Sequence, residues 1–158
     1  MTRDITKPDT VDGRRRDTLT LLAIGAAAAC GYAQVCFNDA LAWARERRTF
    51  GKRQADHQVV RHQLVDMAAR IESTRALLDD LAARLDDGAA PVAQIAMAKN
   101  MATRTFQFCA DRAVQLLGGM GYMRGSRVER LYREVKVMMI GGGAEEIMKN
   151  LAAKQLSL

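Results

Sequence analysis

A basic segment near residue 50 combines the side chains that a phosphate-bearing nucleotide would require. From Arg45 to Gln58 the sequence reads RERRTFGKRQADHQ. Guanidinium groups can form forked hydrogen bonds with a pyrophosphate, and a glycine lets the backbone turn close to a ligand. Thr49 would add a hydroxyl and Phe50 a flat apolar surface. The alternative is a solvated basic helix end followed by an ordinary turn, and these residues alone leave both interpretations open.

The histidines and cysteines do not have the spacing of a metal site. His57 and His62 are five residues apart, whereas side chains on one face of a helix recur every three or four residues. The three cysteines, Cys30, Cys36 and Cys109, are odd in number, which fits reduced thiols in a cytoplasm better than a disulfide framework. We therefore expect no metal ligands, and we expect the cysteines to fill the core.

The chain that must position the basic segment is predicted to be helical. Its composition is rich in Ala, Leu, Met, Arg and Lys and includes only two prolines, so few positions forbid helix. One long helix is expected from about Thr18 to Arg48. Its stretch from Thr18 to Asn38 is uncharged and follows three arginines, which is the outline of a membrane or secretion segment. Because this stretch is built mostly of small residues and continues unbroken to Ala44, a buried helix of a soluble protein is the preferred interpretation.

Further helices are predicted after the turn at Gly51. Apolar residues from Val60 to Leu85 recur at spacings near three, four and seven, the pattern of an amphipathic helix. The next helix begins near Pro91 and is broken by Gly118 and Gly119. A glycine-rich turn then leads to a shorter helix through positions 128–135.

A triple glycine precedes a last helix that begins near Glu145. Long helices joined by short connections are expected to pack antiparallel, so the predicted fold is all-α, an up-and-down four-helix bundle. Residues 1–16 are polar and are expected to form a mobile N-terminal leader, and residues 17–158 to form the bundle domain.

The charge of the chain favours an anionic partner. The formal net charge of the 158 residues is +6, which suits the phosphates of a nucleotide, of coenzyme A or of a nucleic acid. Aromatic residues make up only 5% of the chain, and no basic stretch is interleaved with stacking rings. We therefore expect neither a nucleic-acid partner nor a membrane partner.

Three motifs in order resemble the C-terminal helical domain of the acyl-CoA dehydrogenases. RRTFGK begins at Arg47 and is followed by His57 and Gln58, QLLGGMGY begins at Gln115, and GGGAEEIM begins at Gly141. The likeness runs from about position 25 to position 154. It implies an FAD-dependent oxidoreductase of fatty acid or acyl-CoA metabolism that acts on CH–CH groups of acyl-CoA thioesters, in the cytoplasm and as a homo-oligomer, dimer or tetramer.

The resemblance also implies where FAD would lie. In the family the first motif contacts FAD, largely its adenosine diphosphate portion across a subunit interface, and the second lies against the dinucleotide of a neighbouring subunit. Residues of the last motif approach the flavin. The implied cofactor-binding residues are Arg47, Arg48, Thr49, Phe50, His57, Gln58, Gln115, Leu116, Gly118, Gly119, Glu145 and Glu146.

No catalytic residue is predicted. Enzymes of this family abstract an α-proton with a glutamate while the β-hydrogen leaves as hydride to the flavin. Most members carry that glutamate where this chain has Gly142, and others carry it on the first helix, where ungapped alignment gives Leu21. A shift in that alignment would bring Asp17 into the site. Glu145 and Glu146 are the carboxylates nearest to the lost position, but they are better explained as favourable charge in the first turn of a helix.

The family's N-terminal helical domain and middle β-domain have no counterpart in these 158 residues. We therefore predict a stand-alone or truncated C-terminal domain that self-associates, retains at most partial affinity for FAD and is inactive alone. Acyl-CoA would bind only if the two other domains were supplied. The alternatives are a non-catalytic subunit that completes the FAD site of a full-length acyl-CoA dehydrogenase, or a helical oligomerisation module that does not use the flavin.

Overall fold

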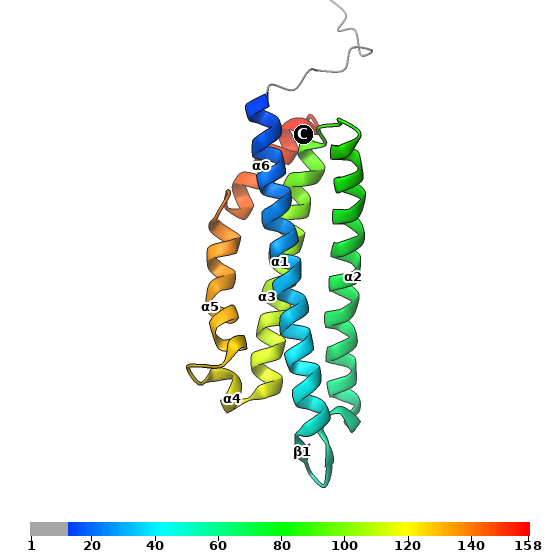
Figure 1. Ribbon diagram of the computed structural model, residues 1–158, viewed down its shortest axis with the longest axis vertical. Coiled ribbons are helices and arrows are strands. Elements are labelled where there is room, and N and C mark those ends of the chain that lie inside the picture. Colours follow the sequence, from blue (N-terminus) through cyan, green and yellow to red (C-terminus); the bar gives the residue numbers. More distant parts are fainter. Residues whose placement is uncertain (1–12) are drawn as a thin grey trace, which may run out of the picture.

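Four helices run side by side along the long axis of the molecule (Figure 1). We describe them from a computed structural model, in which residues 13–158 are placed. The four are α1 (Gly13–Glu46), α2 (Gln58–Asp86), α3 (Val92–Leu117) and α5 (Arg127–Ile140). The all-α, up-and-down bundle predicted from the sequence is confirmed.

Short elements close the two ends of the bundle. At the lower end in Figure 1, strands β1 (Arg48–Thr49) and β2 (Lys52–Arg53) form a hairpin, which the sequence did not predict. The hairpin continues into the 3₁₀ turn η1 (Gln54–Asp56). Helix α4 (Gly119–Tyr122) lies at the same end, and α6 (Glu145–Gln155) lies near the top.

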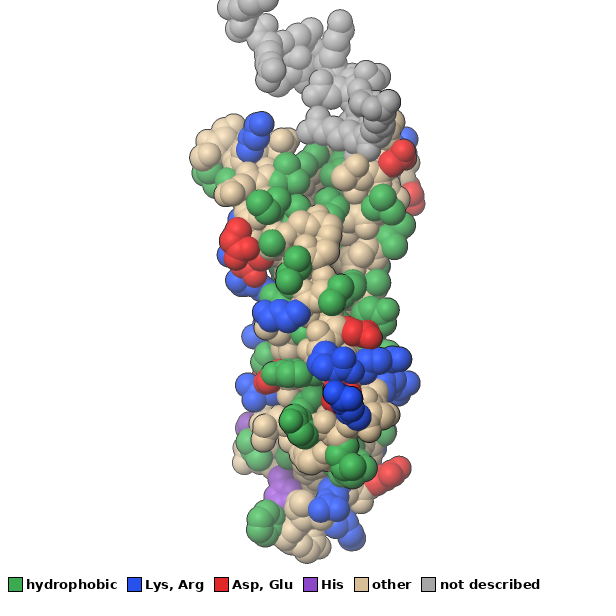
Figure 2. Space-filling view, turned by 90° about the vertical axis from the view of Figure 1, so that its left-hand side faces the viewer, with side chains coloured by type: hydrophobic (Ala, Val, Ile, Leu, Met, Phe, Trp, Pro, Cys, Tyr) green, Lys and Arg blue, Asp and Glu red, His purple; other side chains and the backbone are tan. Residues whose placement is uncertain are grey.

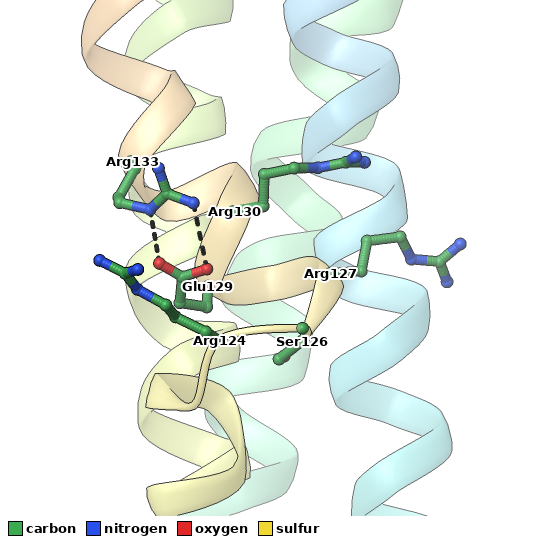
Figure 3. A pocket seen from close by; sticks show the side chains of 7 residues that line it. Arg124, Ser126, Arg127, Glu129, Arg130 and Arg133 are labelled. Atoms are coloured by element: carbon green, nitrogen blue, oxygen red, sulfur yellow. Dashed lines mark hydrogen bonds and ion pairs between the residues drawn. The ribbon is translucent and has the colours of Figure 1, made fainter.

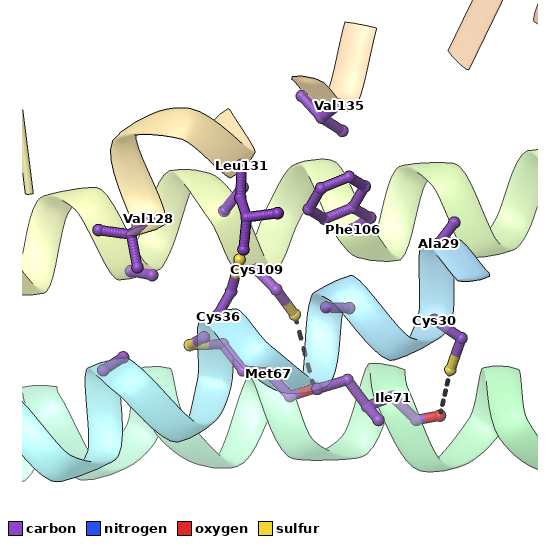
Figure 4. Close-up of a cluster of buried hydrophobic side chains, with 14 of the residues drawn as sticks. Ala29, Cys30, Cys36, Met67, Ile71, Phe106, Cys109, Val128, Leu131 and Val135 are labelled. Carbon is purple, nitrogen blue, oxygen red and sulfur yellow. Dashed lines mark hydrogen bonds between the residues drawn. The ribbon is translucent and has the colours of Figure 1, made fainter. Parts of the chain in front are cut away.

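Small side chains on α1 let it pack closely against α3, which is its most extensive partner. Small buried residues recur along α1 every three or four positions, at Ala26, Ala29, Ala33, Cys36, Ala40 and Ala44, and Leu19 and Cys30 are buried as well. Larger side chains from the other helices fill the space between them, with Met67 from α2, Phe106 from α3 and Leu131 from α5 almost fully buried (Figure 4). The three cysteines are free and buried, as predicted.

By length and composition α1 could also cross a membrane. Within Arg16–Glu46 the most apolar 18-residue window has a mean hydropathy of 1.6, and 33% of that window is buried inside the bundle. The buried positions of α1 belong to the main core, together with residues of α2, α3 and α5. This packing is that of a bundle helix, the interpretation preferred from the sequence.

The first helix begins earlier than the sequence indicated. Residues 13–16, assigned above to a leader, belong to α1. Arginine is a good helix former, and the side chain of Arg16 donates a hydrogen bond to the carbonyl oxygen of Leu85 at 3.4 Å. The first turn of α1 is thus tied to the end of α2. The rest of the predicted leader, residues 1–12, lies outside the described part of the chain.

Candidate functional site

The RRTFG motif forms the tip of the β1–β2 hairpin. Phe50 and Gly51 are its two turn residues, with φ of 51° and 80°, the left-handed conformation of a two-residue hairpin turn. Glycine adopts this conformation freely, but a phenylalanine does so at a cost of about 1 kcal/mol. The Phe50 side chain is also 96% exposed. A strained residue that presents an aromatic ring to solvent is typical of a position kept for binding.

His57 supports the hairpin from the start of α2. Its Nε2 atom lies 3.1 Å from the hydroxyl of Thr49 and 3.2 Å from the Thr49 carbonyl oxygen. Its ring meets Phe50 edge to face, with the centroids 6.3 Å apart. His57 therefore holds two of the predicted contact residues in place. Gln58, the next residue, is exposed on the first turn of α2.

Gln54 joins the hairpin to the end of α3. Its Nε2 donates to the carbonyl oxygen of Leu116 at 2.9 Å, and its backbone N–H donates to the carbonyl oxygen of Arg47 at 2.7 Å. The first two sequence motifs therefore meet at one end of the bundle (Figure 1). Sequence reasoning missed Gln54, because no local pattern shows that a glutamine in a polar segment will reach a helix 62 residues away.

In the QLLGG motif only some of the predicted contact residues are exposed to solvent. Gln115, Gly118 and Gly119 are exposed at the point where α3 ends. Leu116, predicted as a contact, has a side chain only 5% exposed, and its carbonyl oxygen accepts from Gln54. The structure therefore makes Leu116 a support for the site and leaves its neighbours free to face a ligand.

Glu145 and Glu146 lie apart from these residues, at the start of α6. The side-chain amide of Asn100 on α3 donates to the Glu145 carbonyl oxygen at 3.0 Å. Positions 100 and 116 of α3 are separated by about 24 Å of helix rise. The predicted cofactor contacts therefore form two groups near opposite ends of the bundle.

The Glu145 carboxylate is held as an anion. It forms ion pairs with Arg104 and Lys149. Hydrogen bonds from these two side chains lower the pKa of Glu145 to about 2. A carboxylate so stabilised in its charged form is a weak base. These ion pairs agree with the expectation that Glu145 serves as charge in the first turn of α6 rather than as a base.

The two positions expected to carry the base line one small cavity. It measures about 240 Å³, and its polar lining side chains are Lys99 and Thr103; the remaining lining residues are apolar or glycine, among them Leu21 and Gly142. Gly142 has φ of 70°, and a Cβ there would lie 3.2 Å from the Leu22 side chain. Asp17 is exposed one helical turn before Leu21 and does not line the cavity.

Lys99 fixes the backbone next to that cavity. Its ammonium donates to the carbonyl oxygens of Met139 at 2.7 Å and Gly143 at 2.6 Å. Burial lowers the pKa of Lys99, and nearby Glu145 acts in the opposite direction. Lys99 thus caps the end of α5 and holds the glycine turn, a role that the sequence analysis did not identify.

Fold and site together define a helical domain that presents a cationic, aromatic hairpin beside the end of a second helix. A family model described as the C-terminal domain of acyl-CoA dehydrogenase matches residues 17–157. The chain belongs to the acyl-CoA dehydrogenase family and corresponds to its C-terminal domain.

Relatives of known sequence support this assignment. The probable acyl-CoA dehydrogenase YdiO of Escherichia coli K12 is 35% identical over 133 residues, which are 84% of this chain and 35% of that protein. Subunit CarC of the caffeyl-CoA reductase–Etf complex of Acetobacterium woodii is 32% identical over 140 residues, 88% of this chain and 37% of that protein. The chain thus spans little more than a third of the length of such relatives.

Solved structures agree with the fold. A putative acyl-CoA dehydrogenase from Mycobacterium smegmatis matches with a TM-score of 0.86 and 38% identity, over 89% of this chain and 37% of that chain. A glutaryl-coenzyme A dehydrogenase in complex with glutaryl-CoA matches with a TM-score of 0.85 and 32% identity, over 91% of this chain and 37% of that chain.

The hairpin fits the cofactor that the family implies, FAD. Among the described residues neither Arg47 nor Arg48 has a carboxylate partner, so both exposed guanidinium groups are free to bind phosphate. Phe50 offers an uncovered ring. The Oε1 atom of Gln54 is buried beside them without a hydrogen-bond partner. These features favour a ligand that brings anionic, aromatic and donor groups together.

Proposed function

We propose that this chain serves as the dinucleotide-facing helical domain of an acyl-CoA dehydrogenase, binds FAD and self-associates, but does not dehydrogenate acyl-CoA alone. The observation that carries the proposal is the contrast between two sites. The hairpin and the end of α3 are assembled for a ligand, with Gln54 joining them. The cavity at Leu21 and Gly142 is lined without a carboxylate.

Binding would rest on the hairpin. Arg47 and Arg48 would hold the diphosphate by forked hydrogen bonds, and Phe50 would cover an apolar face of the ligand. FAD, when bound, supplies the hydride acceptor of the family's reaction. The contribution of this chain is to bind and orient the cofactor, because its residues near Gly142 provide nothing to accept an α-proton.

The test is purification of the chain with and without FAD. We expect FAD fluorescence to change on titration with the protein, and we expect no reduction of an artificial dye by any of several acyl-CoA thioesters. Arg47→Ala should weaken FAD binding, while Arg84→Ala, an exposed arginine near the end of α2, should leave it unchanged. A yellow protein that reduces the dye would overturn the proposed inactivity. Equal FAD binding by the Arg47→Ala variant would instead favour a helical oligomerisation module indifferent to the flavin.

A second function is favoured by the separation of the two groups of predicted contacts. Because they lie about 24 Å apart along α3, one copy of this chain would meet only part of a cofactor lying at either end. The chain would then act as a non-catalytic subunit that completes the FAD site of a full-length acyl-CoA dehydrogenase. The naming of CarC as a subunit of a larger complex agrees with this idea.

Gentle purification from the native cell distinguishes self-association of the chain from a mixed oligomer with a full-length enzyme. Co-purification with a larger flavoprotein would support the mixed oligomer, and recovery of the chain only with itself would support self-association. We propose the cytoplasm as the compartment, on the support of three free buried cysteines.

A further inference from the structure

Arginines occupy every third position from 124 to 133. Arg124 lies in the loop after α4, and Arg127, Arg130 and Arg133 lie on the first half of α5. Together with Ser126 and Glu129 they line a cavity of about 540 Å³ (Figure 3). Lys and Arg side chains also gather on this face of the molecule in the space-filling view (Figure 2).

The carboxylates around the arginines do not balance them. The Nε of Arg127 donates to Asp39 of α1 at 2.8 Å, and Arg133 pairs with Glu129. Arg130 lies 3.8 Å from Glu134, too far for a hydrogen bond. Arg124 has no carboxylate within ion-pair distance among residues 13–158. Two of the four guanidinium groups therefore keep most of their donors free.

The ion pairs orient Arg127 and Arg133 but leave some of their N–H donors free. Arg127 and Arg133 each engage a carboxylate through Nε and one terminal nitrogen, which leaves further N–H donors on the same guanidinium. Their side chains, like that of Arg130, remain about 60% exposed. Their partner carboxylates, Asp39 and Glu129, are only 20% and 14% exposed, so the fold accounts for these two arginines. It does not account for Arg124 and Arg130, which have no such partner among residues 13–158.

We propose that this arginine cluster, Arg124, Arg127, Arg130 and Arg133, binds an anion that carries phosphate groups. Planar guanidinium forks match the oxygens of a phosphate. Arg124 and Arg133 lie on one side of the cavity and Arg127 and Arg130 extend to the other, an arrangement that suits more than one phosphate group (Figure 3). The hydroxyl of Ser126, which precedes α5, makes no capping hydrogen bond and is available as a further donor. Glu129 is the one carboxylate in the lining, and its pairing with Arg133 offsets its charge.

The site adjoins one of the predicted FAD contacts, because Arg124, Glu129 and Arg133 also line a neighbouring cavity together with Gln115. None of its lining residues belongs to the RRTFG or QLLGG motif. Because Arg47 and Arg48 are themselves proposed to hold a diphosphate, a test must show that binding of a phosphate probe depends on Arg124 and Arg130.

Isothermal titration of the full chain with inorganic pyrophosphate tests the proposal. We expect saturable binding that weakens about tenfold or more in an Arg124→Gln, Arg130→Gln double variant, because each change removes a charged donor. The matched control is Arg61→Gln with Arg84→Gln, which removes the same charge from exposed positions on α2. That control should bind within about twofold of the unmodified protein, and all variants should keep the same melting temperature because the side chains are exposed.

Several results would overturn the proposal. Equal weakening in the two double variants would show that only net charge matters. Loss of pyrophosphate binding in an Arg47→Ala, Arg48→Ala variant would place the probe at the hairpin, whereas retention supports the arginine cluster. Citrate binding as tightly as pyrophosphate would indicate a general anion surface, and tighter binding of a duplex oligonucleotide through Arg124 and Arg130 would indicate a nucleic-acid surface.

Discussion

At the scale of single residues, the most informative side chain is Phe50. It lies in the left-handed region at φ 51° and is almost fully exposed, so it adds neither an easy turn nor buried area to the fold. Its only ring contact among the described residues is the edge of His57. A side chain that costs stability and contributes little packing is best explained by what it contacts outside the chain.

Replacing Phe50 with asparagine should separate stability from binding. Asparagine tolerates the left-handed conformation, so we expect the free energy of unfolding to rise by up to about 1 kcal/mol. FAD binding should weaken at the same time. Urea denaturation and FAD fluorescence titration measure the two effects, and a fall in stability with unchanged FAD binding would contradict the role assigned to the ring.

Gly142→Glu should not create a dehydrogenase. The left-handed backbone at this position costs a non-glycine residue about 1 kcal/mol, and the new Cβ would press on Leu22. We expect lower stability and no dye reduction with acyl-CoA. Gly31→Ala in α1, where no atom lies within 4 Å of the new Cβ, is the control and should raise stability because alanine is the better helix former. Activity in the Gly142→Glu protein would show that the missing carboxylate is the sole defect.

Sequence patterns located the residues of the hairpin but not the bonds that position them. The RRTFG motif, its histidine and the QLLGG motif could be read from residue types in order. The hydrogen bond from Gln54 to Leu116 and the two from Lys99 depend on packing between helices far apart in the chain. Local periodicity holds no information about such contacts, so these residues were missed.

At the scale of elements, α6 is attached through its first turn. Asn100 binds the Glu145 backbone, Arg104 and Lys149 bind its carboxylate, and Met148 packs into a small cluster with Ala93 and Ala96. The sequence predicted this helix and its favourable N-terminal charge. It did not predict that the Glu145 carboxylate would pair with Arg104 of α3, because the two residues are 41 positions apart in the chain.

The attachment of α6 should depend on acid pH. The folded pKa of Glu145 is about 2, below the ordinary 4.5, so the stabilisation is present above pH 4.5 and is lost as pH falls toward 2. We expect the melting temperature to drop across that range, and the drop should be smaller in Glu145→Gln. Glu146→Gln, a change in the same turn, serves as control; an identical acid profile for both variants would refute the assignment.

At the scale of the whole molecule, the length of the bundle separates the two groups of predicted cofactor contacts. The hairpin and the end of α3 form one end, and the Lys99 turn with α6 lies toward the other (Figure 1). Composition and hydrophobic periodicity were enough to predict the helices, and the short connections between them were enough to predict antiparallel packing. The distance between the two ends depends on where each helix begins and ends. Sequence patterns locate these boundaries only to within a few residues.

FAD should promote association of the chain if it lies between copies. A ligand that binds the assembled form shifts the equilibrium by mass action. Sedimentation velocity at fixed protein concentration should therefore show a larger mean mass with FAD than without it. Arg47→Ala should abolish the shift, and an unchanged distribution in the unmodified chain would argue against a cofactor shared between copies.

The buried thiols of Cys36 on α1 and Cys109 on α3 can report how often the core of the bundle opens. Burial raises the pKa of the Cys36 and Cys109 thiols to about 12, so almost no reactive thiolate exists at neutral pH while the bundle is closed. Alkylating reagents should modify these positions only when the helices separate. The rate of their modification would then measure how often the core opens, with no probe added to the protein.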